Sequence, residues 1–347
     1  MKNSILALFT AIVMVTGIAN TTFAAKPKKH NSKIFSLESI TLGGWPQKIL
    51  ITGNDTTKPI LIFIHGGPGF TEMALVMKYN QNLNNHFIVV NWDQRGTALS
   101  YKPSIPKSTM TMEQIIADGH DLTDSLKKRF HRQKIFLVGH SFGTYIATTM
   151  AYRYPKDYYA YIGIGQAANM MDNERVSLAY TIKMAKAAHN QKAINDLAAL
   201  EKRFPQKSTD LPDLYLRRKW LAYFGGAVWK HHDYNSLYTS MDTIHKGIYN
   251  EQLAEESENF TMDALWAQAM TIDLPKTVPQ LKVPVYFMLG RHDYNAPYPL
   301  AQQYFNKLKA PYKKLIMFEN SAHLPCFEEP KKFNSIMAAI AKTAGKG

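Results

Sequence analysis

Runs of apolar residues of strand length recur along the chain and alternate with segments that carry apolar residues at helical spacing. The stretches 59–65, 87–92 and 135–138 are apolar almost throughout, as expected of parallel strands that are buried on both faces. Two shorter strand patterns precede them and meet at Gly43-Gly44, which predicts a hairpin at a sheet edge. This order of strands and helices predicts an α/β fold built on a mostly parallel sheet.

The alternation lapses between 168 and 277. That stretch reads as consecutive helices rich in aromatic residues, and an insertion of this size on an α/β sheet predicts a helical lid over an active site. We therefore expect a first core part at 26–167, the lid at 168–277 and a second core part at 278–347. The expected strands are 34–40, 47–53, 59–65, 87–92, 135–138, 158–165, 283–290 and 314–318. The expected helices are 71–83, 112–130, 144–152, 174–190, 191–204, 211–223, 250–271 and 330–342.

The first 25 residues have the pattern of an export signal. Lys2 precedes an apolar run at 5–19, and small residues follow at positions that a signal peptidase reads, so we expect cleavage near Ala24 or Ala25 and an exported (periplasmic or secreted) protein. The alternative is an uncleaved anchor, but the run is short for a bilayer span and is interrupted by polar residues. No membrane span is expected after cleavage.

Length and composition describe an ordinary globular protein. The chain has 347 residues, of which 46% are apolar and 20% charged. Its formal charge of +14 becomes +13 without residues 1–25, because Lys2 is the only charged residue among them (14 minus 1). The basic residues are scattered and no nucleic-acid-binding motif is present, so we expect a solvated basic surface and no nucleic-acid partner.

A serine between two glycines follows the strand pattern at 135–138. The sequence Gly139-His-Ser-Phe-Gly143 joins a strand to a helix pattern, which is typical of a nucleophile elbow. Ser141 would lie at a strained turn, and the two glycines are expected because a Cβ at either place would collide with the neighbouring strand and helix. The N–H of Phe142 at the helix start would supply half of an oxyanion hole. The alternative is a chance match of a short pattern in a loop.

A second glycine-rich turn follows the strand at 59–65. Its sequence, His65-Gly-Gly-Pro-Gly69, presents backbone N–H groups with no side chain in the way, and these would complete the oxyanion hole. The alternative is a plain glycine turn. The next strand leads into Asp93-Gln-Arg-Gly96.

Two further residues with the chemistry of a serine hydrolase follow strand patterns. Asp293 follows the strand that ends at Gly290, and His323 follows the last strand. Because loops at the carboxyl ends of parallel strands gather along one edge, we expect Ser141, Asp293 and His323 to converge there. The order serine, aspartate, histidine is that of an α/β-hydrolase triad, in which the histidine takes the serine proton and the carboxylate fixes its tautomer.

The single cysteine, Cys326, excludes an intrachain disulfide. It lies three residues after His323, so we expect it near the active site, where a bulky mercurial bound to its thiol would slow catalysis. The alternative is a small buried hydrophobe of no functional consequence.

The sequence resembles the proline iminopeptidase group of α/β-hydrolases in five places. These are the 65–69 and 93–96 motifs, the elbow, and the segments of Asp293 and His323. The resemblance spans most of the chain after residue 25. It implies an α/β-hydrolase fold and an aminopeptidase that releases an N-terminal residue, typically proline, without metal or cofactor. It also implies that Ser141 is the nucleophile, that Asp293 and His323 complete the triad, and that Gly67 with Phe142 forms the oxyanion hole.

The elbow departs from that group. The group commonly has Gly-Ser-Trp after a glycine, where this chain has His140-Ser141-Phe142, a form shared with many esterases and lipases. The group also uses lid carboxylates to hold the substrate's free ammonium. The candidates in this lid are Glu174, Glu201, Glu251, Glu255, Glu256 and Glu258, and we favour the last four.

Three functions are consistent with these patterns. The first is an exported serine aminopeptidase acting on small peptides, and the second is a carboxylesterase or lipase acting on acyl esters. The third is a non-catalytic binding protein that has kept the fold, which the complete set of triad residues disfavours. Substrates with free and blocked amines distinguish the first two.

Overall fold

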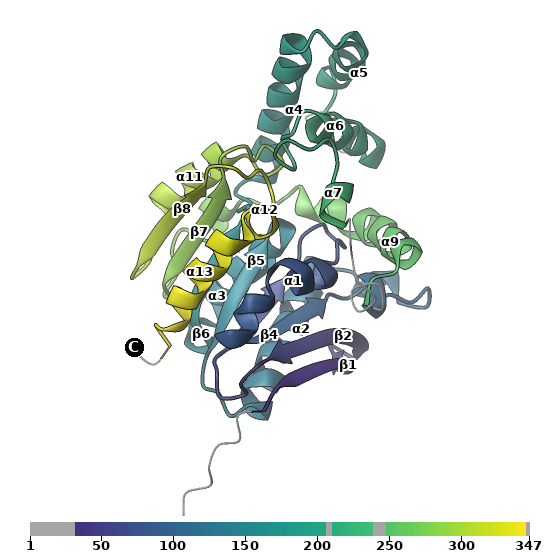
Figure 1. Cartoon of the computed structure of the whole chain (residues 1–347). Helices are drawn as coiled ribbons and strands as arrows, with labels where there is room; N and C mark the ends of the chain where they lie inside the picture. Colours follow the sequence, from purple (N-terminus) through teal and green to yellow (C-terminus); the bar gives the residue numbers. More distant parts are fainter. Residues whose placement is uncertain (1–31, 206–209, 239–247, 345–347) are drawn as a thin grey trace, which may run out of the picture. The chain divides into compact units, whose positions relative to one another are not determined.

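The predicted apolar runs form the central strands of an eight-stranded sheet with the order β1-β2-β4-β3-β5-β6-β7-β8 (Figure 1). The computed structural model describes residues 32–205, 210–238 and 248–344. The expected export signal at 1–25 lies outside the described residues. The strands are β1 Ile34–Leu42, β2 Trp45–Gly53, β3 Ile60–Ile64, β4 Ile88–Asp93, β5 Ile135–His140, β6 Tyr158–Ile164, β7 Val285–Gly290 and β8 Lys313–Phe318.

Pairing within the sheet follows the predicted plan. β1 and β2 form an antiparallel hairpin closed by Gly43-Gly44, β2 pairs antiparallel with β4, and the pairs from β4 through β8 are all parallel. The α/β fold class predicted from the sequence is confirmed. The carboxyl ends of the parallel strands consequently share one edge, where the loops after β3, β4, β5, β7 and β8 begin.

Helices cover both faces of the sheet. The α-helices of the described residues are α1 Met73–Tyr79, α2 Met112–Arg129, α3 Phe142–Arg153, α4 Met170–Ala187, α5 Gln191–Glu201, α6 Leu211–Tyr223, α7 Asn235–Tyr238, α9 Glu251–Ala269, α10 Leu274–Thr277, α11 Tyr298–Lys307, α12 Pro325–Glu328 and α13 Pro330–Ala341. Short 3-10 helices are η1 Gln81–Asn85, η2 Ala98–Ser100, η3 Lys107–Thr109 and η4 Pro155–Asp157. None of the helices among the described residues has the length and apolarity needed to cross a membrane.

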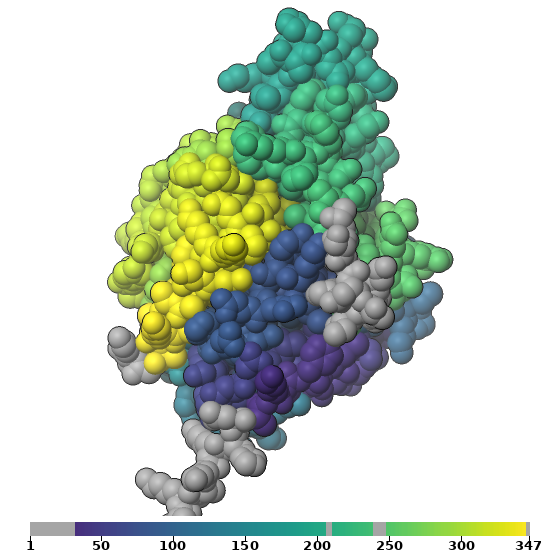
Figure 2. Space-filling view, in the orientation of Figure 1, coloured from purple at the N-terminus to yellow at the C-terminus, as the bar shows by residue number. Residues whose placement is uncertain are grey.

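Alternate residues of β3 show how the sheet is buried on both sides. Ile60, Ile62 and Ile64 belong to one apolar core, which also holds side chains of α2 and α3, whereas Leu61 and Phe63 belong to a second core with side chains of α1, α12 and α13. Figure 2 shows the C-terminal residues, in yellow, beside the blue segment that carries α1 and η1. A parallel strand buried in this way is what its continuous apolar sequence predicts.

The helix predicted at 71–83 is instead two helices. α1 ends before Asn80, whose backbone leaves the helical conformation, and η1 follows. The Asn80 side chain donates hydrogen bonds to the carbonyl oxygen of Cys326 at 3.0 Å and to Oδ1 of Asn334 at 3.1 Å. These contacts, made by residues far along the chain, interrupt a helix that the local pattern favours.

The residues between β6 and β7, 168–277, are here called the lid segment. Their described helices are α4, α5, α6, α7, α9 and α10, of which α4, α5 and α6 gather at the top of Figure 1. The first of these helices starts four residues earlier than predicted, because the Asn169 side chain accepts a hydrogen bond from the N–H of Asp172 at 3.0 Å and caps it. The chain from 31 to 347 forms one compact unit that includes this segment.

Candidate active site

Ser141 lies at the turn between β5 and α3 with a left-handed backbone conformation, φ +52° and ψ −123°. A Cβ on Gly139 would lie 2.5 Å from the carbonyl oxygen of Gly143, and a Cβ on Gly143 would lie 2.3 Å from that of Ile64. Both approaches are shorter than a carbon atom allows. The predicted reason for the two glycines is confirmed, and the residue between them is held in the strained geometry of a nucleophile elbow.

His323 and Asp293 are hydrogen-bonded to each other at the shared edge of the sheet. Nδ1 of His323 lies 2.9 Å from Oδ2 of Asp293, and Oδ1 of the same carboxylate accepts bonds from the N–H groups of Asn295 and Ala296, each at 2.9 Å. Both side chains are buried. With Nδ1 donating to the carboxylate, Nε2 of the neutral imidazole is left as a base, and it has no hydrogen-bond partner among the described residues.

Ser141 and His323 line the same cavity, which has a volume of about 230 Å³. Gly67 lines it as well, and Phe142 is the first residue of α3, so its N–H belongs to the unbonded first turn of that helix. The structure thus brings the five residues of the predicted triad and oxyanion hole to one place. The remaining lining residues are Gly66, Phe70, Glu72, His140, Tyr215, Arg218, Tyr234, Glu258, Asn295 and Leu324.

The two glycine-containing motifs are bonded to each other. Nε2 of Gln94 donates to the carbonyl oxygen of His65 at 2.9 Å, and the N–H of Gln94 donates to Nε2 of the same histidine at 3.2 Å. Arg95 is buried and forms two hydrogen bonds with Asp118, of 2.7 and 3.0 Å, and also donates to the carbonyl oxygen of Gly43. These residues hold the loop that carries Gly67 and the edge hairpin, and they do not line the cavity.

The lid glutamates predicted to hold an ammonium occupy different places. Glu258, on α9, lines the cavity that contains Ser141. Glu251 and Glu255 line a neighbouring pocket that Glu258 also borders, and Glu256 is exposed. Burial raises the pKa of Glu258, against the opposing charge of Arg218. Of the two other candidates, Glu174 is buried in an ion pair with Arg217 and Glu201 is exposed.

A second carboxylate in the cavity, Glu72, was not predicted. It lies just before α1 with 2% of its surface exposed; its Oε1 contacts Nδ1 of His140, and its Oε2 has no hydrogen-bond partner among the described residues. Burial lowers the pKa of His140, but the charge and hydrogen bond of Glu72 outweigh this effect, so that pKa lies above its ordinary value. The one feature of the sequence that could have identified Glu72 is its position, three residues after the 65–69 turn.

Glu328, on α12, lies outside the cavity and holds the His323 loop. It accepts hydrogen bonds from the N–H groups of Ala322 and Leu324 at 3.0 Å, and from the N–H of Trp229 in the lid segment at 2.7 Å. Burial raises the pKa of Glu328 to about 7, although the three N–H donors oppose the shift. The loop that carries the candidate base is therefore bonded to both the core and the lid segment.

Cys326 is fully buried on α12, in the apolar core that contains Phe63 and Phe327. Burial raises the pKa of its thiol well above the ordinary value. The structure therefore favours the small buried hydrophobe over a thiol that a mercurial would reach readily.

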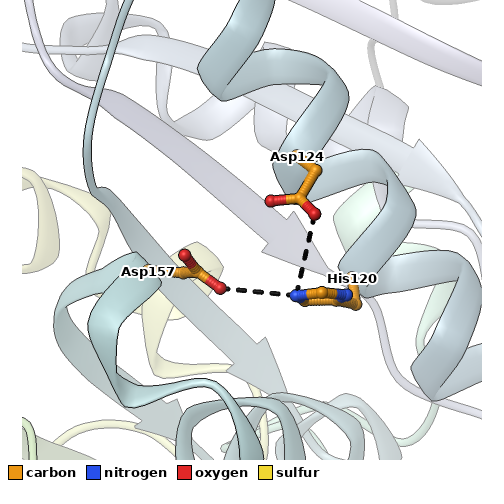
Figure 3. Close-up of side chains that lie close together, drawn as sticks. All are labelled: His120, Asp124 and Asp157. Carbon is orange, nitrogen blue, oxygen red and sulfur yellow. Dashed lines mark ion pairs between the residues drawn. The ribbon is translucent and has the colours of Figure 1, made fainter.

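A cluster of His120, Asp124 and Asp157 lies on α2 and η4, outside the cavity (Figure 3). Nε2 of His120 is 3.4 Å from Asp157 and 3.9 Å from Asp124. The ammonium of Lys127 contacts both carboxylates. Because that ammonium already supplies the positive charge, we assign the cluster to a surface ion-pair network.

Comparison with known proteins identifies the family of the chain. Residues 55–330 match a family described as serine aminopeptidase, S33. The chain is 32% identical over 320 residues to the probable aminopeptidase YbaC of Bacillus subtilis (strain 168), a match that covers 91% of this chain and 98% of the relative.

Solved structures share the fold at low sequence identity. A proline iminopeptidase from Mycobacterium smegmatis has a TM-score of 0.59 and 18% identity, covering 88% of this chain and 98% of that one. A 2-hydroxy-6-oxo-6-phenylhexa-2,4-dienoate hydrolase from Rhodococcus sp. strain RHA1 has a TM-score of 0.62 and 16% identity, covering 90% and 100%. Both likenesses concern the fold alone.

Proposed function

We propose that this chain, which belongs to the serine aminopeptidase S33 family of α/β-hydrolases, releases an N-terminal residue from peptides through an acyl-enzyme on Ser141. The match to a probable aminopeptidase over nearly the whole chain supports this proposal. The finer assignment, to proline as the released residue, rests on the resemblance of the 65–69 and 93–96 motifs to the proline iminopeptidase group.

The observation that carries the proposal is a small cavity that holds a serine, a histidine base and two carboxylates. Glu258 reaches it from the lid segment and Glu72 from the core, next to Ser141 and His323. A free ammonium is costly to desolvate unless a counter-charge meets it, so carboxylates in a sheltered site favour an amine substrate over a neutral ester. An N-terminal residue places its ammonium within a few bonds of the scissile carbonyl.

The arrangement accounts for each proton of the reaction. Asp293 holds the Nδ1–H of His323, so Nε2 takes the proton of Ser141 as Oγ bonds to the carbonyl carbon. The N–H groups of Gly67 and Phe142 would stabilise the oxyanion. The imidazolium then protonates the leaving nitrogen as the peptide C–N bond breaks. Water, deprotonated by the same histidine, attacks the acyl-enzyme, and the imidazolium returns this proton to Oγ of Ser141 as the acyl–oxygen bond breaks and the amino acid is released.

A panel of matched substrates tests the proposal. Prolyl and alanyl 2-naphthylamides with a free amine should be cleaved, whereas their N-acetyl forms should be roughly tenfold to a hundredfold poorer, the worth of a charge-assisted contact. Equal cleavage of both forms would contradict an aminopeptidase.

The aromatic wall of the cavity, formed by Phe70, Tyr215 and Tyr234, favours the second candidate, a carboxylesterase. That function predicts fast hydrolysis of p-nitrophenyl acetate and butyrate and no cleavage of either naphthylamide. The same panel therefore separates the two functions.

A further inference from the structure

Arg218 places a positive charge in the cavity that Glu72 and Glu258 also line. It lies on α6, is partly buried, and lines the cavity together with Ser141 and Glu258. Its Cζ lies 5.6 Å from the centre of the Trp266 ring, a contact that orients the guanidinium without neutralising it.

Arg218 attracts the carboxylate of Glu258 electrostatically, but it makes no direct contact with an acid among the described residues. Within the described ranges it forms no ion pair, and its Nε has no hydrogen-bond partner. The preceding residue, Arg217, is in contrast fully buried, 2.7 Å from Oε2 of Glu174 and hydrogen-bonded to Ser177. On α6, Arg217 therefore binds α4, whereas Arg218 lines the cavity.

The two carboxylates that line the cavity are also available to a ligand. Glu258 forms no ion pair with another described residue, and Oε2 of Glu72 lacks a hydrogen-bond partner there. A ligand that brings only an ammonium would satisfy a carboxylate and leave the guanidinium without a partner. A ligand that carries an ammonium and a carboxylate would satisfy both signs of charge.

The size of the cavity limits where the two charges of such a ligand lie. Its volume of about 230 Å³ is below the roughly 300–1,000 Å³ typical of small-molecule sites. A short molecule can place both of its charged ends within this space. In a dipeptide, the ammonium and the terminal carboxylate flank the single peptide bond that Ser141 would attack.

We propose that Arg218 binds the terminal carboxylate of the substrate, and that the preferred substrates are dipeptides with both ends free. The inference rests on the proposed function and adds to it the anchor for the leaving half of the substrate. The planar guanidinium suits this role because it binds a carboxylate through two parallel hydrogen bonds.

Dipeptides and their C-terminal amides test this assignment. Prolylglycine and alanylglycine are compared with prolylglycinamide and alanylglycinamide by kcat/KM, in the wild type, in Arg218→Gln and in Lys219→Gln. Lys219 is the exposed neighbour on the same helix, so its variant loses the same charge outside the cavity. The wild type should prefer the free acids, and Arg218→Gln should lower the acid-to-amide ratio by roughly tenfold to a hundredfold. Lys219→Gln should leave that ratio unchanged.

Different results would overturn the role of Arg218 and the proposed function. Equal cleavage of acids and amides by the wild type, or an equal loss on both substrates in Arg218→Gln, overturns the role of Arg218 while aminopeptidase activity stands. Cleavage of p-nitrophenyl acetate without cleavage of any peptide overturns both. Thermal unfolding of each variant checks that a uniform loss of activity is not a loss of folded protein.

Discussion

Nε2 of His140 lies 2.9 Å from the backbone carbonyl oxygen of His323, and the two imidazole rings are neighbours. Because a carbonyl oxygen only accepts, Nε2 of His140 carries a proton and donates it. The residue before Ser141 therefore fixes the loop of the candidate base, and Glu72 holds the other nitrogen of the same ring. His140 in the elbow thus has a structural role, which is to bind the His323 loop. The resemblance to esterases and lipases did not indicate this role.

Replacing this ring should cost both stability and rate. His140→Phe keeps a planar ring but removes both hydrogen bonds and leaves Glu72 buried without a partner, which should lower the free energy of unfolding by about 3–5 kcal/mol. The value of kcat should fall with it, since the His323 loop loses an anchor. Urea unfolding and steady-state kinetics measure the two effects. A double-mutant cycle with Glu72→Gln should show that the single losses are not additive; additive losses would contradict the pairing.

The same pair predicts how stability depends on pH. The pKa of His140 is raised in the folded protein, because the attraction of Glu72 outweighs the opposing effect of burial. The contribution of His140 to the free energy of unfolding should therefore be complete below the pKa of the unfolded chain, about 6.5. It should be lost as pH rises through the higher pKa of the folded protein. The free energy of unfolding, measured from pH 6 to 9, should fall more steeply in the wild type than in His140→Phe/Glu72→Gln. Parallel curves would show that the pair does not titrate in this range.

Glu328 should affect catalysis through the position of His323. Glu328→Gln replaces an oxygen that accepts backbone N–H bonds with a donor, so the loop should loosen. We expect kcat to fall by roughly tenfold and KM to change little, because Glu328 does not line the cavity. The control is Glu319→Gln, which removes an exposed carboxylate that lies on the His323 loop and pairs with Arg291 after β7; it should change neither constant. A matching drop in both variants would indicate a general effect of charge.

One carboxylate of the lid segment should matter for amine binding. Glu258→Gln should raise KM for free-amine naphthylamides by roughly tenfold to a hundredfold, because it removes a negative charge from the cavity. Glu256→Gln changes an exposed residue of the same helix and should leave KM unaltered. An unchanged KM in Glu258→Gln would assign the ammonium to Glu72 or to another group.

Patterns local in the chain predicted much of this structure. Continuous apolar runs identified the parallel strands, and strand ends placed Ser141, Asp293 and His323 on one edge of the sheet. The two elbow glycines were predicted because a Cβ there meets backbone atoms of the elbow's own helix and of β3. In each case, the physical cause acts within one strand–turn–helix unit or follows from the parallel order of the strands.

The residues that surround the triad could not be predicted in this way. Glu72 acts through His140, 68 residues along the chain, and Glu328 joins the nearby His323 loop to Trp229, 99 residues away, so no spacing in the sequence indicates either role. The glutamates of α9 were recognised as a group, but which of them faces the cavity depends on how the helix docks. It docks through Ser257 and Thr261, which bond to Ala98 and Gly96, and this turns the adjacent Glu258 inward.

Ser141 is the proposed nucleophile, activated by His323 and Asp293, and one labelling measurement tests this role most directly. The protein is treated with diisopropyl fluorophosphate, digested and mapped by mass spectrometry, with His323→Ala treated in parallel. We expect one adduct, on Ser141, in the wild type, and a rate of labelling lower by roughly 10²-fold or more in His323→Ala, the worth of positioned base catalysis. No adduct on Ser141, or equal labelling rates in the two proteins, would contradict this role.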